Sequence, residues 1–376
     1  MGKNTEKVIV HIANGLFRGG VGSVVQNLLI EQERLGCSTA LLTADSPNII
    51  HEWLKNNNLQ TVPFFVENKR KKFLTIKGCL SKRNYKKIVE VFKEKTIIFH
   101  YHNTISIGLL SCLKKRSIKF CTLHGELYSK KTFSKSITLL TLKRFIRKKG
   151  NLIGCCKHIA NYYKATLKMK YRIPYSLNGV QIEAKGENKY LFNAQKLHIG
   201  FIGRVEELKG WDYLVNAFLS LPKAIKEKVD LTFVGGVSLE ARERFKEILK
   251  ENQDIRYLGV LKDVTTCVMP YLDILVLPSR TEGMPMVILE AMQSGVVCLA
   301  TAVGGIPELI KDNKTGMIIT RDVDDIRVKL EKVITDEQRR KELSQNAKKL
   351  FLEKGTAKAM NDRYLEIYQL SLKDNK

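Results

Sequence analysis

Short apolar runs rich in β-branched residues recur along this sequence and alternate with segments whose apolar residues are spaced as on a helix. In the first half, the expected strands are residues 8–13, 39–43, 61–66, 96–102, 119–124 and 152–156. In the second half, they are residues 196–203, 230–235, 255–259, 273–278, 296–301 and 316–319. Continuous apolar strands alternating with helices indicate parallel sheets covered on both faces. The sequence therefore predicts an α/β fold with two Rossmann-like, doubly wound domains that face a cleft.

A chain of 376 residues is too long for one core and suits two domains of ordinary size. The polar, glycine-bearing stretch 179–195 separates the two series of strands and is the expected linker. We therefore expect an N-terminal domain over 1–185 and a C-terminal domain over 186–355. Residues 356–376 should form a terminal helix that packs back toward the N-terminal domain. The other expected helices cover residues 24–35, 85–93, 211–221, 239–252 and 287–294.

Hydropathy and cysteine usage exclude several classes of protein. No apolar run approaches the roughly 20 residues that cross a bilayer, and the first residues lack the apolar core of a secretory signal. The eight cysteines form no Cys-x-x-Cys pair, so we expect structural thiols and no zinc finger. These features predict a cytoplasmic protein.

The net charge of +26 is concentrated in one part of the chain. Residues 51–200 carry 32 Lys and Arg against 7 Asp and Glu, whereas the remainder is almost balanced. Such a field attracts anionic surfaces such as nucleic acid or acidic lipid headgroups. A lysine-rich solvated face is the alternative. The basic stretch contains no recognisable nucleic-acid reading module, so we expect no nucleic acid as partner and a peripheral contact with an anionic membrane.

Two segments in the first half follow expected strands, where ligands of open α/β sheets bind. Residues 17–23 read Phe-Arg-Gly-Gly-Val-Gly-Ser, with Gly20 and Gly22 placed to let a ligand approach the backbone before a helix begins at residue 24. A dinucleotide-binding fingerprint would have a third glycine where Val25 stands. A tight turn between strand and helix explains these glycines as well as a ligand-binding loop does. His124 is the last residue of the fifth expected strand. Its role is either functional or purely structural.

Two segments in the second half carry charged residues at the same kind of position. Arg204 and Lys209 flank a turn into a helix and could clamp a diphosphate, or remain solvated surface charges. Further along, Glu282 and Glu290 stand eight positions apart. Gly283 would free the backbone there to present N–H groups to an anion, and a carboxylate such as Glu290 suits sugar hydroxyls. Those N–H groups belong to Met284, Met286 and Val287.

Taken together, these four segments and the following Val-Gly-Gly-Ile-Pro-Glu over 303–308 resemble the bacterial family-four type of retaining glycosyltransferases, the glycosyl transferases group 1, with GT-B architecture. The resemblance implies transfer of a hexose from a nucleotide-diphosphate sugar, UDP- or GDP-linked, to a glycan or lipid-linked oligosaccharide acceptor. It places such an enzyme in the synthesis of polysaccharide, capsule or lipopolysaccharide. It also implies no cofactor and no metal.

The resemblance assigns roles to individual residues. Glu282 would hold the transferred sugar, and His124 would contact it near the reaction centre. Arg204 and Lys209 would hold the diphosphate, Glu290 the ribose, and Gly20 would close the donor site from the N-terminal domain. The amides of Gly283, Met284, Met286 and Val287 would bind the sugar and the distal phosphate. The alternatives are a nucleotide-sugar epimerase or phosphorylase-like enzyme on the same architecture, and a basic nucleic-acid-binding protein.

Overall fold

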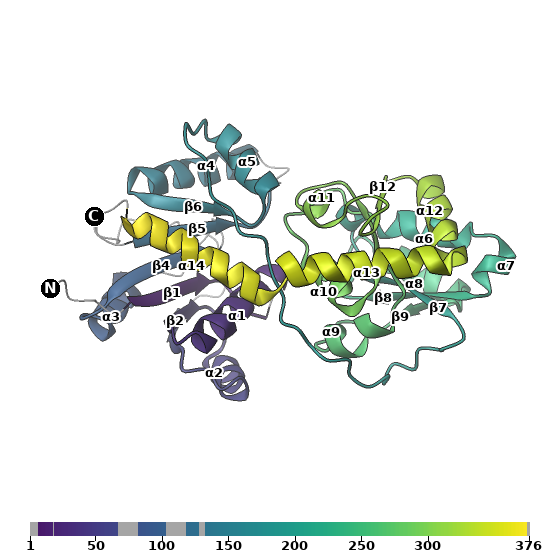
Figure 1. The fold of residues 1–376 in the computed structure, drawn as a ribbon, viewed down its shortest axis with the longest axis horizontal. Helices are drawn as coiled ribbons and strands as arrows, with labels where there is room; N and C mark the ends of the chain where they lie inside the picture. The colour runs from purple at the N-terminus through teal and green to yellow at the C-terminus, as the bar shows by residue number, and fades with distance from the viewer. Residues whose placement is uncertain (1–6, 18, 67–81, 103–117, 128–131, 374–376) are drawn as a thin grey trace. The chain divides into compact units, whose positions relative to one another are not determined.

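The computed structural model of the protein describes residues 7–17, 19–66, 82–102, 118–127 and 132–373. Internal contacts divide the chain into two compact units (Figure 1). Unit 1 comprises Met1–Val180 and Ala357–Lys376, and unit 2 comprises Gln181–Thr356. Each unit contains one sheet of six parallel strands, so the predicted fold class of two Rossmann-like α/β domains is confirmed. Within the described residues, every helix is too short or too polar to cross a membrane.

Unit 1 is built on a sheet with the strand order β3-β2-β1-β4-β5-β6. This is the order of a dinucleotide-binding fold, in which the chain reverses direction across the sheet between β1 and β4. The strands are β1 (Lys7–Ala13), β2 (Ser38–Thr43), β3 (Val62–Phe65), β4 (Thr96–His102), β5 (Ile118–Leu123) and β6 (Gly150–Gly154). The helices are α1 (Gly19–Arg34), α2 (Pro47–Asn56), α3 (Lys82–Val91), α4 (Thr132–Arg147), α5 (Lys157–Thr166) and α14 (Ala357–Lys373).

The last helix, α14, belongs to unit 1 although unit 2 separates it from the rest of that unit in sequence. It lies against α1 and over β4 and β5 (Figure 1, yellow). The hydroxyl of Tyr368 is 2.6 Å from Nδ1 of His100, and the hydroxyl of Tyr364 is 3.0 Å from Oγ1 of Thr122. All four side chains are buried. Polar contacts as well as apolar packing therefore fix α14 to the sheet.

Unit 2 repeats the topology with the strand order β12-β11-β10-β7-β8-β9. Its strands are β7 (Leu197–Ile202), β8 (Val229–Val234), β9 (Ile255–Tyr257), β10 (Ile274–Leu277), β11 (Val297–Thr301) and β12 (Met317–Ile319). Its α-helices are α6 (Trp211–Leu219), α7 (Lys223–Lys226), α8 (Arg242–Glu251), α9 (Val264–Cys267), α10 (Met286–Ser294), α11 (Ile306–Leu309), α12 (Val323–Thr335) and α13 (Glu337–Lys354). Two short 3₁₀ turns, η2 (Glu207–Lys209) and η3 (Met269–Tyr271), complete it.

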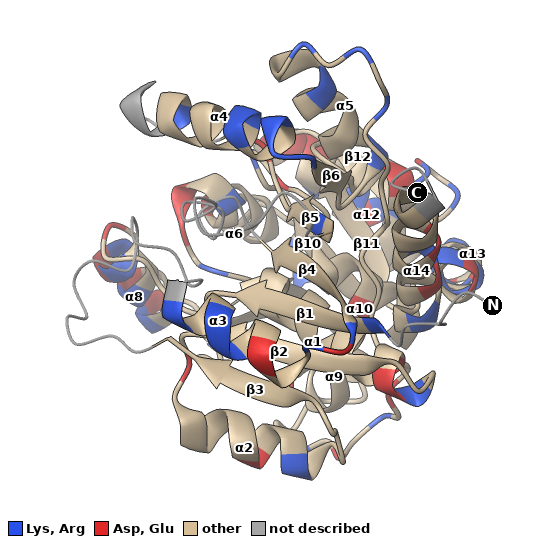
Figure 2. Cartoon of the chain, turned by 90° about the vertical axis from the view of Figure 1, so that its left-hand side faces the viewer, with Lys and Arg blue, Asp and Glu red and all other residues tan. Residues whose placement is uncertain are grey.

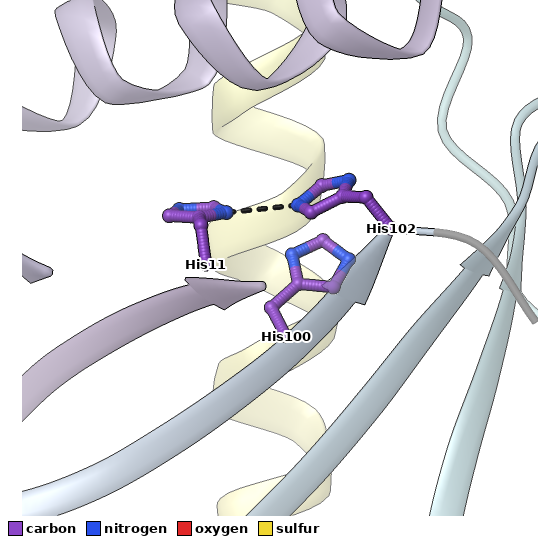
Figure 3. Close-up of side chains that lie close together, drawn as sticks. All are labelled: His11, His100 and His102. Carbon is purple, nitrogen blue, oxygen red and sulfur yellow. Dashed lines mark hydrogen bonds between the residues drawn. The ribbon is translucent and has the colours of Figure 1, made fainter. Parts of the chain in front are cut away.

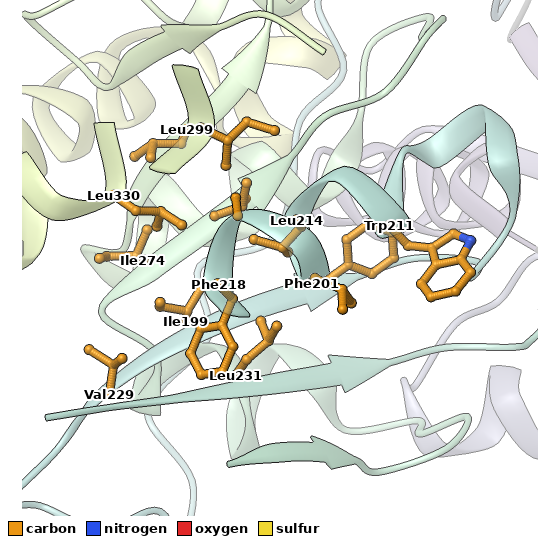
Figure 4. Close-up of a cluster of buried hydrophobic side chains, with 14 of the residues drawn as sticks. Ile199, Phe201, Trp211, Leu214, Phe218, Val229, Leu231, Ile274, Leu299 and Leu330 are labelled. Carbon is orange, nitrogen blue, oxygen red and sulfur yellow. The ribbon is translucent and has the colours of Figure 1, made fainter. Parts of the chain in front are cut away.

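The core of unit 2 lies between the sheet and α6, α8 and α12 (Figure 4). Trp211 and Phe245 stack edge to face with ring centroids 5.4 Å apart, and Phe201 lies 5.1 Å from Phe233. Every residue of β10 is buried, as expected for a central parallel strand covered on both faces. This packing gives the strand ends of unit 2 a rigid base.

Candidate functional site

The sheet of unit 2 has a switch point between its two central strands, β7 and β10. The chain runs from β7 to β8 and β9 on one side of the sheet, and from β10 to β11 and β12 on the other. Ligands of open parallel sheets bind beyond the carboxyl ends of strands at such a point. The segments 203–210 and 278–285 follow β7 and β10 directly. The fold therefore brings two of the segments identified in the sequence to one edge of the sheet.

Lys209 and Glu282 form an ion pair between these two segments. Lys209 Nζ lies 2.6 Å from Glu282 Oε1, and Ser279 Oγ donates to the same oxygen at 2.7 Å. The two charged side chains are 25% and 10% exposed, respectively, so removing either leaves a poorly solvated partner. The second oxygen, Oε2, accepts no hydrogen bond from any described residue. The sequence indicated both residues but gave no sign that they are paired.

Hydrogen bonds to the main chain hold the strand-end loops around this ion pair. The Arg280 N–H donates to the Leu208 carbonyl at 2.8 Å, which joins the loops after β10 and β7. Thr301 Oγ1 at the end of β11 donates to the Ser279 carbonyl at 2.6 Å. Three neighbouring strand ends are thus connected directly, and Glu282 is presented from a well-supported loop.

Gly304 shapes the same loop from the segment after β11. Its φ of 57° lies in the left-handed region, and a Cβ there would stand 2.1 Å from the Glu282 carbonyl oxygen. The next N–H, from Gly305, donates to the Gly283 carbonyl at 2.6 Å. Gly283 itself has no positive φ. The loop that carries Glu282 therefore depends on the conformation of Gly304 and not on that of Gly283, the glycine expected from the sequence.

Helix α10 begins directly after this loop. Its N-cap is Pro285, which provides no side-chain cap. The side chains of Met284 and Met286 are buried, so these residues can meet a ligand only through their main chain. The N–H groups of Met286 and Val287 belong to the first turn, where an anion is stabilised by the amides and the helix dipole.

Arg204, the second member of the predicted clamp, stands apart from the ion pair. Its side chain is 66% exposed, and Nη1 lies 3.2 Å from Glu206 Oε2. The Glu206 side chain is 20% exposed. Because the guanidinium itself is mostly in solvent, its pair with Glu206 is screened and contributes little to stability. The structure places Arg204 after β7, as the sequence predicted, and Arg204 forms no hydrogen bond or ion pair with Lys209 or Glu282.

Glu290 lies one turn into α10 and is partly buried. Burial, and to a smaller extent the neighbouring Glu183 carboxylate, raises the pKa of this carboxyl from 4.5 to about 7. The carbonyl of Glu183 accepts a hydrogen bond from Gln293 Nε2 at 3.0 Å, which ties the start of unit 2 to α10. Glu183 was not expected from the sequence, since it lies in the polar stretch between the two series of strands and no motif marks it.

His124 and Gly20 belong to unit 1, whereas the other predicted site residues belong to unit 2. His124 follows β5 directly, and burial lowers the pKa of its imidazole to about 4. The ring is therefore neutral at pH 7. Its Nε2 is buried and makes no hydrogen bond within the described part of the chain.

The prediction of an open loop over residues 17–23 is wrong, because α1 already begins at Gly19. Gly20 therefore lies in the first turn of a helix. Gly22 is also helical, and a Cβ there would stand 2.2 Å from the Leu16 carbonyl oxygen. Close packing of the helix on the preceding chain explains why no side chain stands at Gly22.

The sequence contains one Asp-x-Asp spacing, Asp322 and Asp324, a pattern that can bridge a metal ion to a diphosphate. Asp322 instead caps α12 by accepting from the Asp325 N–H at 2.9 Å. Asp324 lies in the first helical turn, 3.4 Å from Arg327 Nε. Both carboxylates therefore interact with groups at the start of this helix.

Comparison with known proteins agrees with this architecture. Residues 183–350 match the family model described as Glycosyl transferases group 1. An uncharacterized glycosyltransferase of Methanocaldococcus jannaschii is 28% identical over 344 residues, covering 88% of this chain and 89% of its own. D-inositol 3-phosphate glycosyltransferase of Thermomonospora curvata is 28% identical over 179 residues, covering 45% of this chain and 41% of its own.

Solved structures share the fold over nearly the whole chain. HepE of Anabaena in complex with UDP superimposes with a TM-score of 0.75 at 16% identity, covering 97% of this chain and 99% of that chain. Sucrose-phosphate synthase of Thermosynechococcus elongatus gives a TM-score of 0.76 at 15% identity, covering 98% of this chain and 100% of that chain. These likenesses show an α/β fold of the GT-B type, with two parallel-sheet domains. Within that fold, residues 183–350 are similar to the Glycosyl transferases group 1 domain.

Proposed function

We propose that this protein is a retaining glycosyltransferase that moves a hexose from a nucleotide-diphosphate donor to a glycan or lipid-linked acceptor in cell-surface polysaccharide synthesis. The observation that carries the proposal is the Lys209–Glu282 pair at the switch point of a Glycosyl transferases group 1 domain. The structures of the similar Anabaena protein are described as complexes with UDP and with UDP-glucose. They favour a uridine donor over a GDP-linked one.

Lys209 supplies positive charge where the diphosphate would leave. Breaking the bond to the sugar adds negative charge to the leaving phosphate, so a cation held there stabilises the transition state more than the ground state. Arg204, whose side chain is 66% exposed, can turn from Glu206 toward the same phosphates. With the amides that begin α10, these two side chains would neutralise the diphosphate without a metal ion.

Glu282 offers a fixed acceptor for the transferred sugar. Its Oε1 is held by Lys209 and Ser279, while Oε2 has no partner among the described residues. A sugar hydroxyl can therefore donate to Oε2 without breaking the existing contacts. The neutral ring of His124 can exchange hydrogen bonds with the sugar, and Glu290, when ionised, can accept from the ribose hydroxyls.

The test is a transfer assay with UDP- and GDP-linked sugars and a lipid-linked acceptor, with nucleoside diphosphate release and the anomeric configuration of the product as readouts. We expect a retained configuration, no loss of activity in EDTA, and a fall in kcat/KM of about 100-fold in Lys209→Ala. Lys223→Ala, an exposed lysine on α7, is the matched control. Wild-type rates in Lys209→Ala, or strict dependence on Mg²⁺, would refute the proposal.

We also propose that unit 1 docks on an anionic membrane through α4. Leu142 and Phe145 are buried and anchor this helix, whereas Ile137 and Leu140 are 49% and 62% exposed. Lys and Arg residues follow toward its C-terminal end (Figure 2, blue). An exposed stripe of apolar residues next to basic ones is the pattern of an interfacial helix. Of the other basic clusters in the sequence, 69–72, 114–116 and 130–131 lie outside the described residues.

Vesicle binding tests this membrane contact. Each basic residue near an anionic leaflet contributes about 1 kcal/mol, so the full chain should sediment with phosphatidylserine vesicles at low salt and not with neutral ones. A fivefold Lys/Arg→Gln variant on or just after α4 should stay in solution, and a fivefold control in unit 2 should bind as the wild type does. The first set is Lys143, Arg144, Arg147, Lys148 and Lys149. The control set is Lys223, Lys228, Lys246, Lys250 and Lys348. Equal binding to both vesicle types would contradict a charge-dependent contact.

A further inference from the structure

Three histidines meet in the interior of unit 1, at the switch point of its sheet (Figure 3). His11 on β1 stands directly opposite His100 on the adjacent strand β4, and His102 lies two residues further along β4. Alternate residues of a strand project from the same face, so the three rings share one side of the sheet. All three are buried, and each offers a nitrogen within 4.8 Å of the other two.

Hydrogen bonds determine which nitrogens are available. His11 Nδ1 lies 2.9 Å from His102 Nε2, and His11 Nε2 lies 2.8 Å from the amide oxygen of Gln32. The Gln32 oxygen can only accept, so His11 carries its proton on Nε2 and presents a bare Nδ1. His102 then donates through Nε2 to that nitrogen. Its own Nδ1 is buried and has no partner among the described residues.

The hydrogen-bond network is therefore incomplete at His102. The amide nitrogen of Gln32 is likewise buried without a partner in the described part of the chain. Buried polar atoms without a partner are rare and require an explanation such as a bound water or ion. An ion bound by the rings would let the His102 proton move from Nε2 to Nδ1, which leaves Nε2 as a ligand and releases no proton.

The surroundings keep the rings in the form that binds metals. Burial lowers the pKa of His11 to about 4 and those of His100 and His102 well below the ordinary value, and the neighbouring histidines lower the latter two further. Neutral imidazole is the ligating form. Outer partners also orient the rings, since Gln32 holds His11, and Thr122 and Tyr368 hold His100 at 2.7 and 2.6 Å. Metal-bound histidines have such outer partners.

We propose that His11, His100 and His102 bind one divalent transition-metal ion of the zinc type, with a water molecule completing the coordination. Zinc–nitrogen bonds of about 2.0–2.1 Å in tetrahedral geometry place ligand nitrogens about 3.3 Å apart. The His11–His102 pair would open slightly from 2.9 Å, and the widest pair would close from at most 4.8 Å. His100 would exchange one of its two hydroxyl partners for the metal and keep the other.

This site lies in unit 1 and shares no residue with the donor site of unit 2. The expectation that the donor diphosphate is bound without a metal concerns unit 2 and does not bear on this ion. The His102 ring lies 5.8 Å from the ring of His124, which the proposed function places near the sugar. An ion here would cross-link β1 to β4, the two central strands of the sheet. Because Tyr368 on α14 holds His100, the ion would also support the docking of the terminal helix.

Metal titration of the full-length chain tests the proposal. The protein is purified with EDTA, freed of chelator and titrated with Co²⁺ and then Zn²⁺. We expect one Co²⁺ per chain with the visible absorption of a low-symmetry nitrogen site, displaced by an equivalent of Zn²⁺. Absence of saturable binding would overturn the proposal. A sulfur-to-cobalt charge-transfer band would also overturn it, because the ion would then be bound by cysteine.

Two variants assign the binding to the cluster. In His102→Asn, Co²⁺ affinity should fall by at least about 100-fold, the upper end of the effect of losing an outer partner. We choose His102 because one of its nitrogens has no hydrogen bond to a described residue. His51→Asn removes an exposed histidine on α2 and is the matched control. Wild-type affinity in His102→Asn would overturn the proposal.

Imidazole NMR of the wild-type chain gives a result that does not depend on how a buried variant folds. The chain has seven histidines. One equivalent of Zn²⁺ should strongly shift the ring nitrogens of three of them and leave those of His51 and His158, which are both exposed at the surface, unchanged. Shifts confined to exposed histidines would contradict a buried site.

Discussion

Replacing Glu290 by Gln should affect folding and donor binding in opposite directions. The pKa of Glu290 is raised from 4.5 to about 7 by burial and by Glu183. Each pKa unit corresponds to about 1.4 kcal/mol, so a fully buried carboxylate would cost about 3 kcal/mol when it ionises. Because Glu290 is only partly buried, we expect Glu290→Gln to raise the free energy of unfolding by about 1–2 kcal/mol at pH 8.

The pH dependence of this difference follows from the raised pKa. The folded state holds the Glu290 proton up to about pH 7, whereas the unfolded state releases it near 4.5. The contribution of Glu290 to the free energy of unfolding of the wild type therefore declines as the pH rises from 4.5 to 7, and it is constant above pH 7. The stability difference between Glu290→Gln and wild type should be close to zero near pH 4.5 and reach its full size above pH 7. Urea unfolding at several pH values measures it.

Donor binding should respond the other way. If the ionised Glu290 accepts hydrogen bonds from the ribose, Glu290→Gln should lose about 1.5–3 kcal/mol of donor affinity at pH 8, roughly a 10- to 100-fold rise in Kd. Wild-type affinity should fall as the pH drops below about 7, and affinity of the variant should not. Calorimetric titration with UDP checks this. A variant that is less stable at pH 8 and binds UDP as the wild type does would refute the reasoning.

Four substitutions test the support of the site and of the fold. Lys209→Ala and Arg204→Ala should lower kcat/KM by factors that are less than multiplicative in the double variant, since both act on one diphosphate; independent factors would contradict a shared target. Gly304→Ala should destabilise unit 2 by about 1–3 kcal/mol and weaken donor binding, because its Cβ meets the Glu282 carbonyl; unchanged thermal unfolding would contradict the crowding. Tyr364→Phe should cost about 1–2 kcal/mol in urea unfolding, since it removes a buried hydrogen bond between α14 and β5; no change would show that apolar packing alone holds α14.

The strands were the part of the fold most readable from the sequence. All twelve expected segments are strands whose ends lie within two residues of the prediction. Parallel strands covered on both faces are continuous apolar runs, as in Ile274–Leu277, where every side chain is buried. The local sequence is therefore sufficient to identify these strands.

Helices with a narrow buried stripe were harder to recognise. The 18-residue helix α13 was not predicted, and its buried residues are only Leu343, Ala347 and Phe351, spaced four apart among charged side chains. Helix α1 was predicted to begin five residues late, because its first turn is rich in glycine, which disfavours helices. Close packing of Gly22 on the Leu16 carbonyl, a tertiary contact, decides its conformation instead.

The site was readable as a set of residue types but not as a set of contacts. The positions of Lys209 and Glu282 at strand ends followed from the strand pattern. Their pairing joins residues 73 positions apart and depends on the order of strands in the sheet. The same holds for the His11–His102 contact, which needs β1 and β4 to be neighbours. No local motif contains that information.

Thermal unfolding of the full-length chain with UDP, GDP, ADP and CMP, each with and without a sugar, tests the central claim most directly. A ligand at a hundredfold excess over its Kd stabilises the folded state by about 2.7 kcal/mol. The proposed donor site predicts a rise in Tm with UDP or GDP, little effect of CMP, and loss of the rise in Lys209→Ala, whose side chain is the ammonium at the switch point. No stabilisation by any nucleoside diphosphate, or a full rise that persists in Lys209→Ala, would contradict it.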